Sequence, residues 1–287
     1  MLGIFATARS NQFHPRGSLF IRVIRGYFPM DTYPISEEQI RFFRDSGFVQ
    51  LDAVLTEDEL AEIRGALDEV SGMKLTKALD RTGVSTDYNR LFTQKVNLWR
   101  EHEGVRRFVM SRKLGELARK LCGASAVRLW HDHALIKPGT DSRPTPWHQD
   151  LPYWPMHQTG ALSCWMALDD VDESNGCMRF IPGSHQVGRL APIRLVDPQD
   201  IFGLVPGRTL DGVEPVVARM KAGSCTFHDG LTFHSAFTNE SGRPRRAMVV
   251  IYMPDGTTYY EKPHPCTDGL GLHTGEPLAG ELFPLIA

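Results

Sequence analysis

The sequence predicts an α+β protein in which a layer of N-terminal helices packs against an antiparallel β core. Helix-capping signals and helical spacing of apolar residues are confined to the part before Gly123, and short β-like runs between glycines and prolines follow it. Strands this short and this evenly spaced indicate a sandwich or barrel. The chain has 287 residues, of which 41% are hydrophobic, so it can bury a sizeable core without cross-links.

The first expected helix covers residues 37–45. Ser36 and Gln39 form a capping box at its start, because each side chain can bond the backbone N–H of the other residue. Gly47 ends the helix, since glycine readily adopts the left-handed conformation of a helix C-terminus. Residues 47–51 then form a short strand.

Two further helices are expected. Thr56 and Glu59 form a second capping box, and the apolar residues after it recur at helical spacing: Leu60, Ile63, Ala66, Leu67 and Val70. A third helical region covers about 105–121.

After Gly123 the pattern changes to short strands. The expected strands are 127–136, 161–168, 177–181, 214–220, 224–227, 231–234 and 247–253. Residues 138–146 and much of 186–212 are expected to be loops.

Composition and charge limit the domain organisation, the partners and the location that can be expected. We expect residues 1–33 to form a flexible extension and residues 34–287 to form a single domain. Residues 1–30 contain four arginines and no acidic residue, a composition that transit peptides share.

A net charge of −2 offers no basic surplus for binding nucleic acid, and no apolar run reaches the roughly 18 residues of a membrane span. Five cysteines without a CxxC pair argue against a disulfide framework or structural zinc. A cytoplasmic location is expected, with organellar targeting by residues 1–30 as the alternative.

Two segments carry the chemistry. In Trp147-His148-Gln149-Asp150, an extended backbone would direct His148 and Asp150 to the same side, with Cα atoms roughly 6–7 Å apart. Taken alone, this pattern is better explained by a loop aspartate that bonds a neighbouring imidazole. His234 follows 84 residues after Asp150, and two histidines with one carboxylate form the three-ligand face of non-haem iron sites. Arg245 can hold a carboxylate bidentately.

Longer segments carry a resemblance to a known family. They are WHQDLPYW (147–154), CWMALDDVDESNGCMRFIPGSH (164–185), HSAFTNESGRPRRA (234–247) and the helical start ISEEQIRFFRDSGFVQL (35–51). Between about residues 34 and 254 the chain resembles the phytanoyl-CoA dioxygenase family of Fe(II)- and 2-oxoglutarate-dependent oxygenases. The resemblance implies a double-stranded β-helix (jelly-roll, cupin-like) core with flanking N-terminal helices.

The resemblance also implies a set of site residues. His148, Asp150 and His234 match the iron ligands, and Arg245 matches the arginine that binds the distal carboxylate of 2-oxoglutarate. Trp165, Lys95, Thr145 and Ser235 are further expected contacts of the co-substrate. Ser235 comes one residue before Ala236, the position where some family members have a hydroxyl. Related halogenases have Ala or Gly in place of Asp150, so its carboxylate implies oxygen transfer here.

The implied reaction uses O2 to hydroxylate an aliphatic C–H of a small molecule, with release of succinate and CO2; desaturation or ring closure are variants of it. No catalytic residue is expected beyond the metal centre. Two other functions stay open at this point: a zinc-type hydrolase acting on an anionic substrate, and a non-catalytic binding protein of the same fold. Consumption of 2-oxoglutarate separates the oxygenase from both.

Several residues near these segments remain ambiguous. His228 competes with His234 for the third metal position, and His131 with His133 forms an alternating pair that could itself bind metal. We prefer His234 as the ligand. The residues expected to line a substrate pocket are His133, Trp130, Tyr153 and Trp154.

Overall fold

The computed structural model describes residues 32–80 and 86–287, so residues 1–31 of the expected extension lie outside the described part. The helices are α1 (Glu37–Ser46), α2 (Glu57–Ser71), α3 (Thr86–Leu91), α4 (Glu103–Val109) and α5 (Arg112–Cys122). The strands are β1 (Phe48–Leu51), β2 (Leu79–Asp80), β3 (Thr93–Val96), β4 (Val127–Lys137), β5 (Thr145–His148), β6 (Leu162–Ala167), β7 (Met178–Phe180), β8 (Val216–Ala218), β9 (Cys225–Asp229), β10 (His234–Ala236) and β11 (Arg245–Pro254).

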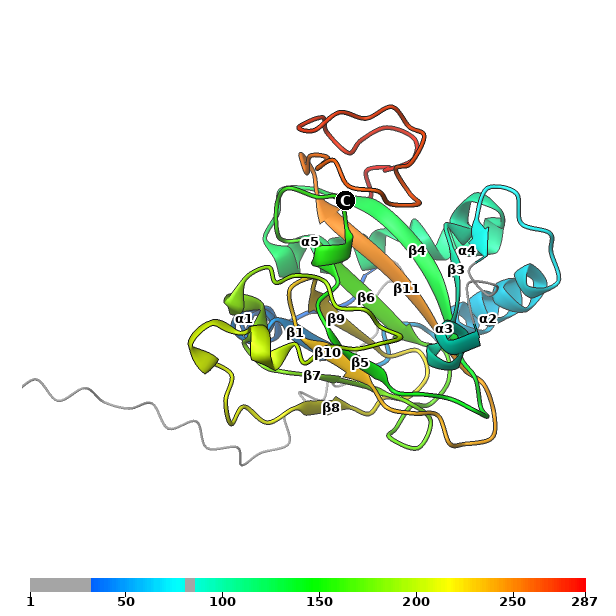
Figure 1. Ribbon diagram of the computed structural model, residues 1–287. Coiled ribbons are helices and arrows are strands. Elements are labelled where there is room, and N and C mark those ends of the chain that lie inside the picture. The colour runs from blue at the N-terminus through cyan, green and yellow to red at the C-terminus, as the bar shows by residue number, and fades with distance from the viewer. Residues whose placement is uncertain (1–31, 81–85) are drawn as a thin grey trace, which may run out of the picture.

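The strands form two antiparallel sheets (Figure 1). The larger sheet has the order β1-β9-β6-β11-β4-β3-β2, and the smaller has the order β5-β10-β7-β8. Strands that are distant in the chain are neighbours in both sheets, as in a jelly roll. The double-stranded β-helix expected from the resemblance is therefore confirmed.

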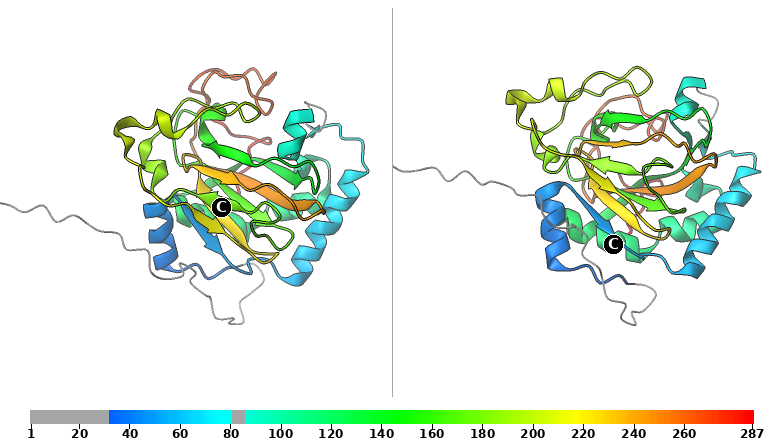
Figure 2. Two further views of the ribbon diagram at one scale, coloured as in Figure 1. Left: turned by 60° about the horizontal axis from the view of Figure 1, so that its bottom comes forward. Right: turned by 90° about the horizontal axis from the view of Figure 1, so that it is seen from below.

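Helices α1, α2, α4 and α5 cover one face of the larger sheet (Figure 2). Along β11 the side chains alternate: Met248, Val250 and Tyr252 pack with the helices, and Val249 and Ile251 face the space between the sheets. Both faces of β11 are buried, which explains why the sequence there reads as a continuous apolar run.

Both capping boxes form as expected. Ser36 Oγ accepts from the Gln39 N–H at 3.1 Å, and the Ser36 N–H donates to Gln39 Oε1 at 2.9 Å. Thr56 and Glu59 make the same reciprocal pair at 3.2 and 2.8 Å. Gly47 ends α1 with a φ of 82°, the left-handed conformation that favours glycine. These local signals place the helices without help from tertiary contacts.

Three local expectations were wrong. The single helix over about 105–121 is two helices, because the chain breaks at Met110 and Ser111 caps the second one. The expected strand 231–234 is mostly a turn, and pairing begins only at His234. Residues 138–146 were expected to be a loop throughout, but strand β5 already begins at Thr145.

The long connection between β7 and β8 has its own small core. Ile193, Ile201 and Val205 are buried there against Ile181 and Phe233. This packing holds the connection beside the smaller sheet, so that part of it can line a cavity. Within the part of the chain that the structure describes, no helix has the length and apolarity needed to cross a membrane.

Candidate metal centre and its cavity

Two histidines meet because their strands are neighbours. In the antiparallel pair of β5 and β10, His148 and His234 are direct Cα partners. Cross-strand partners project to the same face, and the two imidazole centroids lie 4.1 Å apart. Both side chains are buried. Strand pairing thus brings together two imidazoles that are 86 positions apart in the sequence.

Asp150 reaches the pair through a turn rather than through strand alternation. Strand β5 stops at His148, and Asp150 has helical backbone angles at the start of a short 3-10 helix, Leu151–Tyr153. The N–H groups of Asp150 and Leu151 both donate to the Gly230 carbonyl, at 2.9 and 2.8 Å. The juxtaposition is as expected, but the extended backbone assumed for Asp150 was wrong.

Gly230 permits this close approach. A Cβ atom at Gly230 would lie 3.0 Å from Leu151 Cβ and 3.1 Å from the Ala161 carbonyl oxygen. Both neighbours are held by the surrounding fold, so a side chain here would push away the turn that carries Asp150.

The carboxylate lies between the two imidazoles. Asp150 Oδ1 is 3.5 Å from His148 Nε2 and 3.6 Å from His234 Nε2. Burial alone would raise the pKa of Asp150, but the surrounding imidazoles, with His234 foremost, hold that pKa well below its ordinary value. Burial and the nearby His148 lower the pKa of His234 well below its ordinary value. The cluster therefore combines an ionised carboxylate with a neutral imidazole.

The far nitrogens of the rings orient them. His148 Nδ1 lies 2.8 Å from the Pro146 carbonyl oxygen, and His234 Nδ1 lies 3.0 Å from that of Thr232. A carbonyl oxygen only accepts, so in the neutral rings each Nδ1 carries the proton and each Nε2 keeps the lone pair that a metal ligand needs. The three ligand atoms lie within 4.8 Å of one another. This donor set fits a divalent first-row metal with open positions for other ligands.

His228, the competing histidine, has a different place. Its Nε2–H donates to Asp150 Oδ2 at 3.4 Å, and the Ser163 hydroxyl donates to the same oxygen at 3.1 Å. Ser163 and His228 are cross-strand partners on β6 and β9. Together they hold the carboxylate so that Oδ1 faces the imidazoles. The preference for His234 over His228 agrees with this geometry.

A buried arginine lies at the start of β11. Arg245 Nη2 donates to the Gly176 carbonyl at 3.0 Å, and the guanidinium lies 5.0 Å from the centroid of the Trp165 ring. Its Nε and Nη1 are buried with no hydrogen-bond partner among residues 32–80 and 86–287. Burial lowers the pKa of Arg245 to about 10, so the group is still a cation at neutral pH. A buried cation with two unused donors fits a carboxylate ligand.

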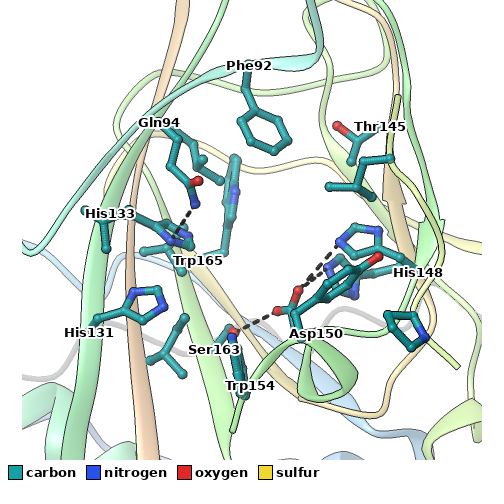
Figure 3. A pocket seen from close by; sticks show the side chains of 18 of the residues that line it. Phe92, Gln94, His131, His133, Thr145, His148, Asp150, Trp154, Ser163 and Trp165 are labelled. Atoms are coloured by element: carbon teal, nitrogen blue, oxygen red, sulfur yellow. Dashed lines mark hydrogen bonds and ion pairs between the residues drawn. The ribbon is translucent and has the colours of Figure 1, made fainter. Parts of the chain in front are cut away.

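Arg245 and the His-Asp-His cluster line one cavity of about 660 Å³ (Figure 3). Thr145, Trp165 and Ser235 line it too, as expected. The Thr145 hydroxyl accepts from Lys137 Nζ at 3.4 Å, and the Ser235 hydroxyl accepts from Arg179 Nε at 2.6 Å.

Lys95 is not brought into this group. Alternate residues of β3 face the cavity, and these are Gln94 and Val96. The side chain of Lys95 therefore lies on the other face of the strand, away from the cavity lining. Lys95 was expected at the cavity, but its neighbour Gln94 lies there instead, because successive residues of a strand point to opposite faces of the sheet.

Three of the four expected pocket residues line the cavity: His133, Tyr153 and Trp154. Trp130 does not, because its ring is buried against Phe283 at a centroid distance of 5.3 Å. An apolar residue on a strand has no local signal that tells cavity from core.

The rings of His131 and His133 are neighbours, with centroids 5.3 Å apart, and both residues line the cavity, but they share no group of three possible metal ligands within the described residues. His131 instead groups with His264 and Cys266, with ligand atoms within 4.8 Å. Burial raises the pKa of the Cys266 thiol to about 12, and His264 Nδ1 accepts the Cys266 N–H at 3.2 Å. This second group thus has a protonated thiol and a ring nitrogen already used as an acceptor, unlike the first cluster.

Several lining residues had no signal in the sequence. They come from β3, from the connection after β7 and from the C-terminal segment: Gln94, Phe92, Pro192, Ile193, Lys262, Pro263 and His264. Only contacts between distant segments bring them to the cavity.

Comparisons with known proteins agree with this architecture. The family model described as phytanoyl-CoA dioxygenase matches residues 43–247. A probable alpha-ketoglutarate-dependent hypophosphite dioxygenase from Stutzerimonas stutzeri is 26% identical over 227 residues, covering 75% of this chain and 77% of that protein. Ectoine dioxygenase from Bordetella parapertussis is 27% identical over 244 residues, covering 76% and 75%.

Solved structures give the same result. The non-haem alpha ketoglutarate-dependent carbocyclase SnoK from nogalamycin biosynthesis superposes with a TM-score of 0.75 at 30% identity, covering 88% of this chain and 97% of that one. The epimerase SnoN, solved with Fe3+, alpha ketoglutarate and nogalamycin RO, has a TM-score of 0.73 at 29% identity, covering 88% and 98%.

Proposed function

The chain belongs to the phytanoyl-CoA dioxygenase family and is an Fe(II)- and 2-oxoglutarate-dependent oxygenase, and from this premise we propose that His148, Asp150 and His234 hold its iron. The converging Nε2 atoms and carboxylate oxygen described above support the assignment. The zinc hydrolase and the non-catalytic protein are not favoured by the relatives, which are named as oxygenases or related enzymes.

The protein supplies position and charge to this centre. Bound Fe(II), with 2-oxoglutarate and O2, supplies the oxidising power to break an aliphatic C–H bond, with succinate and CO2 as co-products. The backbone carbonyls of Pro146 and Thr232 keep each ligand imidazole in the tautomer that can bind metal. Burial of the two histidine ligands limits the access of bulk water to the centre.

Arg245 binds the distal carboxylate of 2-oxoglutarate. Its unused donors leave the guanidinium able to bind a carboxylate, and the Trp165 ring limits where the guanidinium can lie. Thr145 and Ser235 are additional contacts, because both residues line the same cavity as this arginine.

The substrate is a small molecule that undergoes hydroxylation at an aliphatic carbon. A cavity of about 660 Å³ lies within the range of roughly 300–1,000 Å³ usual for small-molecule sites. The same oxidation can end in desaturation or ring closure, so product mass distinguishes the outcomes.

One observation supports this function most: a buried metal-ligand cluster and a buried, unpaired arginine line the same cavity. The test is succinate formation from 2-oxoglutarate by purified protein with Fe(II), ascorbate and air. We expect slow turnover without substrate. If the iron-loaded protein neither forms succinate nor binds 2-oxoglutarate, the assignment is wrong.

Ser163 should tune the metal affinity through Asp150. Ser163→Ala removes the 3.1 Å hydrogen bond to Oδ2 and frees the carboxylate to rotate. We expect Fe(II) affinity to fall about 10- to 100-fold, the usual effect of losing a partner of a metal ligand. Competition with a chromogenic chelator measures it.

Ser71→Ala is the matched control, because Ser71 lies at the end of α2 and bonds only the Leu67 carbonyl there. Its metal affinity should equal that of the wild type. Equal affinity in Ser163→Ala would contradict the role given to Ser163.

A further inference from the structure

A chain of three side chains lines the cavity beyond the proposed iron ligands. The Tyr88 hydroxyl donates to Gln94 Oε1 at 2.9 Å, and Gln94 Nε2 lies 3.0 Å from His133 Nδ1. All three residues line the cavity. Figure 3 shows Gln94 directed at the His133 ring.

This chain determines which nitrogen of His133 carries the proton. In the structure the Gln94 amide has its Oε1 on the tyrosine hydroxyl and its NH2 directed at His133. An amide NH2 only donates, so Nδ1 of His133 must accept. A neutral imidazole with an accepting Nδ1 has its proton on Nε2.

The sheet register keeps this chain in place. Gln94 pairs with Leu135 and Val96 pairs with His133 across β3 and β4, and all four residues line the cavity. Gln94 and His133 are thus diagonal neighbours on one face, a spacing that long side chains can bridge. His133 is also neutral, since burial lowers its pKa to about 4. The cavity therefore receives a neutral N–H donor held by two strands.

The walls around this donor are largely apolar. They include Leu79, Phe92, Trp154, Ile193, Val196 and Val249. An apolar cavity with a few oriented polar groups binds an apolar ligand and selects the polar group that matches. A neutral N–H donor matches an oxygen acceptor such as a carbonyl, whereas an ammonium group of a ligand has no lone pair and would meet another donor.

We propose that the Nε2–H of His133, oriented by Gln94 and Tyr88, selects substrates that have a carbonyl oxygen on an otherwise apolar framework. This rests on the proposed function only in taking the cavity for the substrate site. His133 is a specificity-determining residue here, and Gln94 is a positioning residue that acts through it.

The first test is the tautomer itself. Long-range 1H–15N spectra of metal-free protein with 15N-labelled histidine report which ring nitrogen is protonated, and His133→Phe assigns the signal. We expect the proton on Nε2. A proton on Nδ1 would overturn the proposal. In Gln94→Leu we expect a mixture of the two tautomers, whereas Thr93→Ser, one residue earlier on the opposite face of β3, should leave the signal unchanged.

The second test compares two probes of the same shape. The binding of 1-tetralone, a bicyclic ketone, and of tetralin, which lacks the oxygen, is measured by calorimetry on metal-free protein with 2-oxoglutarate present. We expect the ketone to bind about tenfold more tightly, the usual net contribution of one hydrogen bond. His133→Phe should remove this preference and leave tetralin binding within about twofold.

Three other results of the probe comparison would overturn the proposed substrate class. They are equal affinities in the wild type, a preference kept by His133→Phe, and no binding of either probe. The proposed function is tested separately by succinate formation. Loss of succinate formation with the ketone preference intact would refute the iron and co-substrate assignments and leave this one standing.

Discussion

Asp150→Ala should abolish oxidation of substrate. The variant leaves two imidazoles without the carboxylate that balances the charge of the metal, and its site loses one of three ligands. Removing one member of a catalytic group that acts together costs roughly 10⁴–10⁶-fold in rate. Succinate formation should fall at least that far. Fe(II) at 100 times its Kd should stabilise the wild type by about 2.7 kcal/mol, and this stabilisation should vanish in the variant.

Asp172→Ala is the control for this experiment. Asp172 is an exposed acid in the loop before β7, outside the cavity lining. It should keep both the succinate rate and the metal-dependent rise in melting temperature. A variant at Asp150 that still gains stability from Fe(II) and still forms succinate would refute the ligand set.

Arg245→Met should remove binding of 2-oxoglutarate while leaving the metal in place. Each hydrogen bond to a charged group contributes about 1.5–3 kcal/mol, so losing the two bonds of the fork should weaken the affinity by at least about 100-fold. The ligand-free variant should be as stable as the wild type or more so, because an apolar chain replaces a buried charge that has no acid partner among the described residues. Thermal melting with and without 2-oxoglutarate measures both effects.

Arg246→Gln is the matched control. Arg246 is the next residue of β11, and its guanidinium pairs with Asp169 at 2.9 Å. It should bind 2-oxoglutarate as the wild type does. Unchanged co-substrate affinity in Arg245→Met, or the same loss in both variants, would contradict the role given to Arg245.

Short sequence patterns were sufficient to predict two helix starts and the cluster of possible metal ligands. The capping boxes at Ser36 and Thr56 act within four residues, so they mark helix starts whatever the rest of the chain does. The cluster of His148, Asp150 and His234 was predictable because a metal site needs rare residue types, and their spacing matched a known family. Arg245 followed from the same spacing, and its burial without an acid partner in the described residues agrees with that prediction.

Position within the sheets required the tertiary structure. Gln94 rather than Lys95 faces the cavity because the pairing of β3 with β4 sets which alternate residues point inward, and a shift of one residue reverses them. Asp150 meets its partners through a turn held by Gly230, a contact 80 residues away in the chain.

The partners of the site residues also depend on distant segments. His228 became the support of Asp150 rather than a ligand because β9 pairs with β6, which brings Ser163 beside it. Trp130 is core because the C-terminal Phe283 covers it. Residue types and short spacings specify which chemistry a chain can perform, but strand register and long-range packing decide which side chains meet, since each depends on residues far apart in the sequence.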